Sequence, residues 1–310
     1  MQVSKEEEMV KGRVMRVDTL RIEGKAIIFA GRTFKLARIK EEWYDDVENP
    51  ELMIKSLREA KPRPDILTFW QRLPEIIPKY NYYMEWDSIA ALPIIGYEHW
   101  FKKQIDTNAR RAIRKAEKNG VEVKAVKFDD EFINGMINIF NETPIRQGRP
   151  FWHYGKDFET VKRQFARYLY REDLIGAYHN GELIGFIMLG HAGKYAELGQ
   201  IISKIGHRDK CPNNALMAKA VEMCQKKEIP YLTYGLWKRG NWSEFPRRNG
   251  FEKVDLPRYY VPLSIRGEII LKLGLHRGIK GVLPDKVLGG LLHLRKQYWT
   301  WKYGGRAIQT

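Results

Sequence analysis

The first part of the chain alternates between short β-rich runs and turn residues. These runs cover residues 13–22, 26–29 and 33–37. A glycine lies in each break between them, which predicts a meander of antiparallel hairpins. Proline follows Asn49 at a first helical position, so a helix is predicted over 50–60, with extended segments at 65–70 and 80–92. Together these elements predict a small α+β unit.

The pattern changes to a helical period between residues 98 and 119. Apolar residues recur on one face, from Phe101 to Ala116, and Gly120 supplies a C-terminal stop. Five basic residues fall together on the opposite face: Arg110, Arg111, Arg114, Lys115 and Lys118. The segment therefore predicts an amphipathic helix with one basic face.

Strands and helices alternate over the following residues up to 262. A strand at 121–126 precedes helices at 129–141 and 157–170. Three antiparallel strands are predicted at 174–178, 182–189 and 195–203, because Asn180-Gly181 is a strong hairpin signal and the middle strand is apolar on both faces. The order ends with a helix at 215–226, a strand at 231–234, a short helix at 243–248 and a strand at 251–262. No internal repeat is evident.

Three stretches carry a family resemblance. Arg111-Ala-Ile-Arg114-Lys115-Ala-Glu-Lys118-Asn-Gly120-Val121 resembles the "R-x-I-R-K-A-x-K-x-G-V" helix of the FemABX-like branch of GNAT acyltransferases. Glu142-Thr-Pro-Ile-Arg146-Gln-Gly148 resembles the "E-T-x-x-R-x-G" segment of that branch, and Phe245-Pro246-Arg-Arg-Asn249-Gly250 resembles its closing "F-K-x-x-F-G" motif. The resemblance covers residues 98–262, and the element order there is also that of the GNAT fold.

The resemblance implies an α+β fold with a mixed sheet. We expect a GNAT-like acyltransferase domain over 98–262, a small N-terminal α+β domain over 1–97 and a basic amphipathic helical tail over 263–310. The N-terminal unit is short for a complete domain, and a reduced first GNAT-like half is one interpretation of it. Relatives use acyl-CoA or aminoacyl-tRNA as donor. Pro246 and Asn249 depart from the motif, and residues 204–214 lack the "Q/R-x-x-G-x-G/A" pyrophosphate pattern of ordinary GNAT enzymes.

Positive charge is concentrated in two stretches of the 310 residues. The chain carries 54 Lys and Arg against 38 Asp and Glu, a net charge of +16, and 12 of those charges lie in residues 98–127 and 263–310. A located positive charge fits a phosphate-bearing donor, tRNA or an anionic membrane surface. Solvated helix faces are the competing interpretation.

Acyl transfer to an amine needs a base, an oxyanion donor and a hold on the donor's phosphates, but no covalent nucleophile. The loop before the helix at 215 is the candidate phosphate site, because its backbone N–H groups and the helix N-terminus face the same way. A polar surface loop capped by Asn213 or Asn214 is the alternative. The candidate donor-binding residues are Lys204, Gly206, His207, Arg208, Lys210, Asn213 and Asn214.

Glu142 and Tyr234 are the candidate catalytic residues, as base and hydroxyl donor. An ion pair of Glu142 with Arg146 or with the basic helix, and core packing of Tyr234, are the alternatives. Aromatic and basic residues in two loops suit a sugar or nucleotide diphosphate acceptor, although such loops also occur without a ligand. The candidate substrate-binding residues are Arg146, His153, Tyr154, Trp237 and Lys238.

Other chemistries lack their residues. The two cysteines, Cys211 and Cys224, form neither a disulfide framework nor a zinc motif, and no two of the seven histidines are close in sequence, so we expect no metal. The dinucleotide, P-loop and serine-hydrolase motifs are absent. The acidic start and the lack of a run of about 18 apolar residues lead us to expect a cytoplasmic protein.

The tail alternates leucine-rich stretches with basic residues between 265 and 303 and ends in Trp299 and Trp301. A pair of basic amphipathic helices at a membrane surface is one interpretation, and a helical hairpin docked on the N-terminal unit is the other. Both interpretations are compatible if the helices dock on the N-terminal unit and their basic residues form a rim that faces lipid.

The sequence as a whole predicts an N-acyltransferase, cytoplasmic or membrane-peripheral. We expect it to move an acyl or aminoacyl group from acyl-CoA or aminoacyl-tRNA onto an amine of a cell-envelope glycan or peptide precursor. The alternative is a non-catalytic nucleic-acid-binding protein that uses the basic 98–120 helix and the tail. The neutral N-terminal 97 residues count against that alternative.

Overall fold

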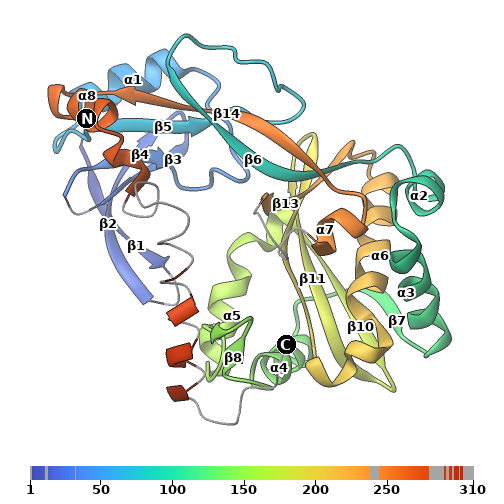
Figure 1. Cartoon of the computed structure of the whole chain (residues 1–310). Coiled ribbons are helices and arrows are strands. Elements are labelled where there is room, and N and C mark those ends of the chain that lie inside the picture. Colours follow the sequence, from blue (N-terminus) through green and yellow to red (C-terminus); the bar gives the residue numbers. More distant parts are fainter. Residues whose placement is uncertain are drawn as a thin grey trace.

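A twelve-stranded mixed sheet runs through the molecule (Figure 1). The computed structural model describes residues 2–10, 13–31, 33–237 and 244–278, with residues 290, 293–294, 297–299 and 301–302 of the tail. The strand order is β1-β2-β3-β4-β5-β14-β6-β13-β12-β11-β10-β7. The mixed α+β architecture predicted from the sequence is therefore confirmed.

The N-terminal half begins with four antiparallel strands. They are β1 (Ser4–Val10), β2 (Arg13–Ile22), β3 (Lys25–Ala30) and β4 (Leu36–Ile39). Helix α1 (Pro50–Glu59), capped by the Asn49 side chain, then crosses over to β5 (Ile66–Trp70), which lies parallel to β4. The sequence pattern did not predict β1, whose Ser-Lys-Glu-Glu-Glu start lacks apolar alternation, because pairing with β2 fixes that strand.

The second half repeats this arrangement. Four antiparallel strands are β7 (Glu122–Val126), β10 (Glu172–His179), β11 (Glu182–Ala192) and β12 (Tyr195–Ser203). Helix α6 (Pro212–Lys226) crosses over to β13 (Tyr231–Leu236), which is parallel to β12. The predicted helix at 215 thus starts earlier, because Pro212 suits the first helical turn.

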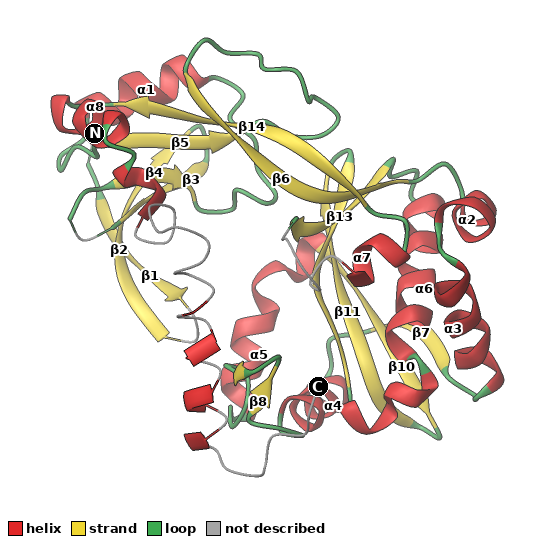
Figure 2. Cartoon of the chain, viewed as in Figure 1, coloured by secondary structure: helices red, strands yellow, loops and turns green. Residues whose placement is uncertain are grey.

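Helices cover both faces of the second half (Figure 2). Helices α3 (Thr107–Lys118) and α6 lie on one face, and α4 (Asp130–Phe140) and α5 (Phe158–Phe165) lie on the other. Along β11, Ile187 and Leu189 belong to the first core, and Phe186 and Met188 belong to the second. This double burial explains why the strand is apolar on both faces. The smaller elements here are η2 (Ala166–Arg171), η3 (Ile205–Lys210), the hairpin β8 (Ile145–Arg146) and β9 (Arg149–Pro150), and α7 (Glu244–Arg248).

Two long strands join the halves. β6 (Tyr83–Pro93) pairs with β13 of the second half, and β14 (Glu252–Pro262) inserts between β5 and β6 (Figure 1). Thus β6, from the N-terminal half of the sequence, pairs with a strand of the second half, and β14, from the second half, pairs with β5 of the first. The domain boundaries at residues 97 and 262 stay predictions, and a single sheet joins strands from both sides of residue 97.

The single helix predicted over 98–119 is wrong. The chain forms α2 (Tyr97–His99) and a π-helical turn η1 (Trp100–Gln104), and it becomes extended at Ile105 before α3 begins. The Asp106 side chain accepts a hydrogen bond from the Ala109 amide at 2.6 Å, so it caps a new helix. Trp100 is fully buried, and its indole N–H donates to the Asn249 carbonyl, which holds the turn against α7.

The tail begins with the predicted helix. Helix α8 (Ile265–Lys272) packs Ile270 and Leu271 against Ile66 of β5, and η5 (Leu275–Arg277) follows. Residues 279–289 lie outside the described part of the chain, as do several later ones, so the second predicted tail helix stays a prediction. None of the described helices combines the length and the hydrophobicity that crossing a lipid bilayer requires.

Candidate active site

The parallel pair of the second half opens partway along its length. β12 and β13 pair at Tyr195–Tyr231, Ala196–Leu232 and Glu197–Thr233, and no later pair joins them. An opening of about 300 Å³ follows, lined by β12 from Glu197, by β13 from Tyr234 and by Pro246 of α7. On its other side β12 shifts register against β11, which leaves Gly199 as a bulge. A bulge at this point bends the strand away from its partner.

Glu197 lies at the start of the opening. Its side chain is buried, with 7 % of the residue exposed, and it accepts hydrogen bonds from the Thr233 hydroxyl and from the Gly235 amide at 2.9 Å. Burial raises the pKa of Glu197 to about 7, and the two hydrogen bonds and Arg72 oppose that rise. A carboxylate with a pKa near neutrality is suited to general base catalysis.

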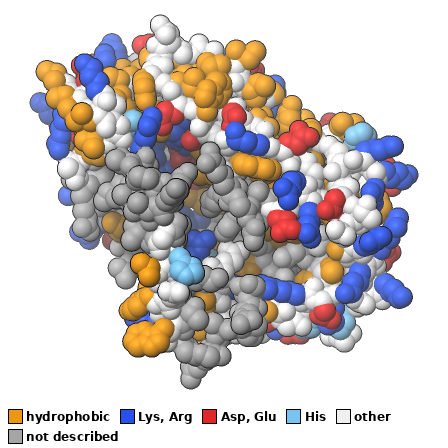
Figure 3. Space-filling model, in the orientation of Figure 1, with side chains coloured by type: hydrophobic (Ala, Val, Ile, Leu, Met, Phe, Trp, Pro, Cys, Tyr) orange, Lys and Arg blue, Asp and Glu red, His pale blue; other side chains and the backbone are white. Residues whose placement is uncertain are grey.

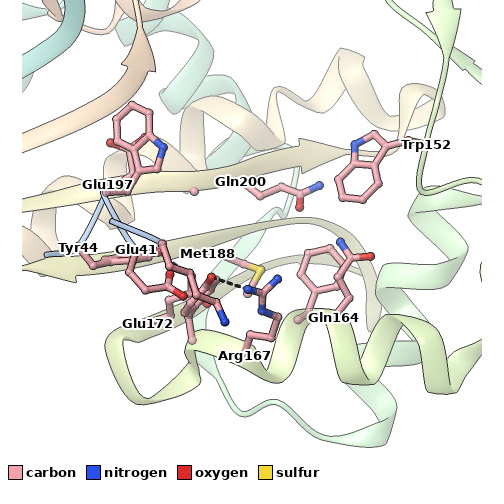
Figure 4. Close-up of a pocket in the computed structure, with 14 residues that line it drawn as sticks. Glu41, Tyr44, Trp152, Gln164, Arg167, Glu172, Met188, Glu197 and Gln200 are labelled. Carbon is pink, nitrogen blue, oxygen red and sulfur yellow. Dashed lines mark hydrogen bonds between the residues drawn. The ribbon is translucent and has the colours of Figure 1, made fainter. Parts of the chain in front are cut away.

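Glu197 also lines a cleft of about 490 Å³ between the two halves, which we name the carboxylate cleft (Figure 4). In Figure 4, Glu197 and Gln200 project from β12, and Gln164 and Arg167 project from the α5–η2 segment on the other side. The side chains that define its chemistry are Glu41, Tyr44, Trp152, Arg167, Glu172 and Glu197.

A segment of the N-terminal half closes one side of the carboxylate cleft. Tyr44 donates a hydrogen bond from its hydroxyl to Glu172 Oε1 at 2.9 Å, and Tyr195 donates to the Trp43 carbonyl at 2.8 Å. Arg171 pairs with Asp45 at 2.8 Å. The cleft therefore exists only because residues that follow β4 cross over to the second half.

A second cleft of about 490 Å³ has the opposite charge, and we name it the arginine cleft. Arg146, Arg149 and Arg208 line it, and its described lining residues include no Asp or Glu. The two clefts share Trp152, Gly199 and Gln200. A basic and an acidic cleft thus meet at the bulge of β12, next to Glu197.

Glu142 lies beside the predicted phosphate loop. Its two carboxylate oxygens accept hydrogen bonds from the amides of Ile205 and Gly206, at 2.6 and 2.8 Å, and from Arg146 at 3.1 Å. The alternative of an ion pair with Arg146 is therefore present. The role of Glu142 as a base stays a prediction, and its contacts hold two amides that the sequence assigned to a phosphate.

Two predicted substrate-binding residues line the arginine cleft from largely buried positions. Arg146 also donates to the carbonyls of Ile139 and Ser203, each at 3.0 Å, and burial lowers its pKa. His153 is buried and stacks on Phe140, and burial lowers its pKa to about 3, with Lys156 and Arg146 adding to the effect. His153 is therefore neutral at physiological pH.

The predicted donor-binding residues divide into two groups. Arg208 and Asn213 line the arginine cleft. Lys204 instead pairs with Glu182, His207 Nε2 lies 3.5 Å from the same carboxylate, and Lys210 pairs with Asp209 at 3.4 Å. The backbone amide of Gly206 donates a hydrogen bond to Glu142, and the backbone amide of Asn214 donates to the Cys211 carbonyl at 3.1 Å.

Two of the remaining candidates, Tyr234 and Trp237, line the opening. Tyr234 lines both the opening and the arginine cleft, and burial raises the pKa of its hydroxyl, with Glu197 adding to the rise. Trp237 also lines the opening, and its amide donates to the Ser88 carbonyl at 2.8 Å. Tyr154 is exposed, and Lys238 lies outside the described residues.

Sequence analysis missed Glu197 and Glu172. The signal for Glu197 was one acidic residue inside the otherwise apolar strand run Tyr195-Ala-Glu197-Leu. Glu172 gave no such signal, because its position beside Tyr44 depends on contacts between the two halves. Across the described ranges, no three His, Cys, Asp or Glu side chains come together as metal ligands.

Three solved structures share this fold. FemX is 11% identical with a TM-score of 0.54, covering 83% of this chain and 88% of its own. The C-terminal domain of a putative lysylphosphatidylglycerol synthetase from Agrobacterium fabrum is 11% identical, with a TM-score of 0.55 and coverage of 84% and 88%. L-PGS from Bacillus licheniformis is 13% identical, with a TM-score of 0.55 and coverage of 84% and 89%. No family model and no curated protein matches the sequence. The predicted FemABX-like fold is therefore confirmed.

Proposed function

We propose that this protein transfers an acyl or aminoacyl group to an amine of a cell-envelope glycan or peptide precursor. The observation that carries the proposal is Glu197, a buried carboxylate with a pKa of about 7 where β12 and β13 separate and two clefts meet. A fold shared with FemX and the lysylphosphatidylglycerol synthetases supports the same reaction class by analogy.

The two clefts have opposite charge, so in our proposal each binds one of the two substrates. The arginine cleft complements a donor that carries phosphate, as acyl-CoA and aminoacyl-tRNA both do. The amine reaches the bulge of β12 from the opposite side. Glu197 takes a proton from the ammonium form and so frees the nitrogen lone pair. That lone pair forms the new C–N bond, the C–S or C–O bond of the donor breaks, and the second nitrogen proton passes to solvent, from which Tyr234 regains the proton that it gives to the leaving group. The Tyr234 hydroxyl, between the opening and the arginine cleft, protonates the leaving sulfur or oxygen.

The structure constrains how a donor's phosphates bind. Because Glu142 already accepts the Ile205 and Gly206 amides, the phosphate contacts in our proposal come from the side chains of Arg208 and Asn213. Arginine suits this role because its planar fork holds phosphate with two parallel hydrogen bonds. Such contacts are compatible with the diphosphate of CoA and with the backbone of a tRNA acceptor end.

One observation favours nucleic-acid binding as a second candidate. Arg111, Arg114, Lys115 and Lys118 are exposed on α3, at the edge where Figure 3 shows Lys and Arg side chains gathered. Helix α3 lies next to η3, the loop that carries Arg208. A tRNA donor and a non-catalytic RNA ligand would both use this face.

Contact with a membrane surface through the tail also belongs to the proposal. Ile265, Ile269 and Leu273 are exposed on one side of α8, with Arg266, Lys272 and Arg277 close by in sequence. A helix with exposed apolar residues among basic ones suits an anionic lipid surface. We expect co-sedimentation with vesicles that contain anionic lipid, and an Ile269→Glu variant that stays in solution would support the contact.

The test is a transfer assay with the full chain. Radiolabelled acetyl-CoA, or a labelled mixture of aminoacyl-tRNAs, is incubated with glucosamine or with Nα-acetyl-lysine amide, and the amide product is counted. We expect product with one donor, loss of product in Glu197→Gln and none of that loss in Arg38→Gln. Absence of product with both donors, together with equal binding of charged and uncharged tRNA, would reject the proposal in favour of nucleic-acid binding.

A further inference from the structure

The wall of the carboxylate cleft is rich in acidic side chains, although the protein as a whole has a net charge of +16. Glu41, Glu172 and Glu197 line it against Lys40 and Arg167. Both cations are already paired with Glu8, which lies behind the wall and is itself buried. The cleft therefore presents an excess of carboxylate to whatever enters it.

Two of these carboxylates form no direct ion pair within the described residues, although Arg72 acts on Glu197 at longer range. Among the described residues, neither Glu172 nor Glu197 takes part in an ion pair. Glu172 accepts one hydrogen bond, from Tyr44 to Oε1, and its buried Oε2 has no hydrogen-bond partner within the described chain. A buried carboxylate without a cation or a full set of donors is costly, and a ligand cation relieves that cost.

The same two carboxylates act on one side chain. Both Glu172 and Glu197 raise the pKa of Tyr44, which lies between them in the cleft wall, and burial is the largest cause of that rise. Burial likewise raises the pKa of Glu172.

Aromatic side chains complete the cleft. Trp43, Tyr44, Trp152 and Tyr168 line it, and Tyr44 and Tyr168 have ring centroids 5.4 Å apart. Lys156, Arg167 and Arg171 already lie over the rings of Trp152, Tyr168 and Tyr44. The aromatic side chains therefore serve to cover the apolar side of an organic body. The amide side chains of Gln164 and Gln200 add polar groups to the lining.

We propose that the carboxylate cleft is a binding site for a primary ammonium group, held by Glu172 and packed against the aromatic wall, with its nitrogen directed to Glu197. This inference rests on the proposed function only for the direction of the nitrogen, because binding itself requires no donor. An amino sugar and a lysine side chain share this chemistry, and they are the two sources that the test separates.

The experiment is calorimetric titration of the full chain, without donor, at a pH where the amines are charged. The probes are glucosamine, Nα-acetyl-lysine amide and N-acetylglucosamine, the last being the neutral counterpart of the first. We expect saturable binding of one amine, at least tenfold weaker binding of N-acetylglucosamine, and at least a tenfold loss of amine affinity in Glu172→Gln. Glu222→Gln, on the exposed surface of α6, is the matched control and keeps the parent affinity.

The outcomes decide between ligands and between proposals. Stronger binding of glucosamine assigns the cleft to an amino sugar, and stronger binding of the lysine derivative assigns it to a peptide. Binding of N-acetylglucosamine as tight as that of the tighter amine, unchanged affinity in Glu172→Gln, or no binding of either amine would overturn the inference. Tyr44→Phe guards against a folding defect, because it keeps the Glu172 carboxylate and is expected to bind the amine at least as tightly as the parent. Amine binding without transfer would reject the proposed function and leave this inference standing.

Discussion

The two halves of the sheet each contain one parallel strand pair joined by a crossover helix, yet only one pair carries the candidate site. Ala37 lies opposite Leu67 in the β4/β5 pair, and Ala196 lies opposite Leu232 in the β12/β13 pair. The next residues are Arg38 and Thr68 in the first half and Glu197 and Thr233 in the second. The same frame therefore presents an arginine in one half and a buried carboxylate in the other.

Thr68 and Thr233 occupy equivalent positions in the two strand pairs, but different side chains surround them. In the first half, Arg258 of β14 donates to Thr68 at 3.4 Å and pairs with Glu42 at 3.2 Å and with Asp87. In the second half, Thr233 donates to Glu197, and the space beyond it is the opening. Side chains from β14 thus fill the first position with an ion-pair network, whereas the second position remains accessible.

The largest expected effect comes from exchanging the carboxylate. Glu197→Gln keeps the shape and one acceptor oxygen for the Gly235 amide but removes the proton acceptor, so we expect turnover to fall by about 10³-fold, within the usual range of acid–base contributions. Arg38→Gln changes the matching position of the first half, and its turnover is expected to stay within about twofold of the parent because Arg38 pairs with Glu42 of its own half at 3.2 Å. Equal losses of turnover in both variants would show that the two matching positions do not differ in function. Steady-state kinetics of the transfer assay give both values.

Tyr234→Phe ranks second. The variant keeps the ring that packs near Phe245 and Phe251, with centroids 6.3 and 6.1 Å away, and removes only the hydroxyl. We expect turnover to fall by roughly 10²-fold with an unchanged melting temperature. Parent-like activity would limit Tyr234 to packing, which is the role that Phe69 has in the first half.

Thr233→Val is expected to lower turnover at neutral pH by about tenfold and to move its pH dependence upward. The Thr233 hydroxyl donates a hydrogen bond to the charged form of Glu197 and so lowers the pKa of Glu197. In the valine variant, Glu197 therefore keeps its proton to a higher pH. Thr68→Val is the matched change, and we expect it to leave the pH profile of turnover where it was. A shift of the Thr233→Val profile toward acid would contradict the assignment of Glu197 as base.

The smallest expected effect concerns stability. The folded protein holds the Glu197 proton up to about pH 7, whereas the unfolded chain loses it near the usual value, so the parent loses stability as pH rises between those values. Glu197→Gln has no such dependence, and its advantage over the parent should grow from pH 5 to pH 8, to on the order of 3 kcal/mol. Urea unfolding at the two pH values measures the difference, and an advantage independent of pH would show that Glu197 titrates normally.

Much of the fold was predictable because it depends on local patterns. The hairpin at Asn180-Gly181, the crossover helix before β13 and the doubly apolar β11 follow from turn chemistry and periodicity, and the FemABX-like fold follows from three short motifs. The break before α3 was not predictable from the apolar stripe, because it depends on the burial of Trp100 against Asn249.

The site was less predictable than the fold. The sequence identified Arg146, Arg208, Asn213 and Tyr234, which do line the clefts, because their motifs or loops are local. Glu197 and Glu172 gain their character from burial and from contacts with residues that follow β4, more than 120 positions away in the case of Tyr44. The repeat escaped detection because the halves share little more than Leu67-Thr68 and Leu232-Thr233 at equivalent positions.

The central claim is that Glu197 acts as the base of an acyl transfer. Its most direct test is the pH dependence of kcat/KM for the parent and for Glu197→Gln, measured with the donor and amine that the transfer assay identifies. We predict that the parent profile rises with pH through an inflection near 7, as the carboxyl loses its proton, and that this inflection is absent from the residual activity of the variant. The same inflection in both proteins would contradict the account.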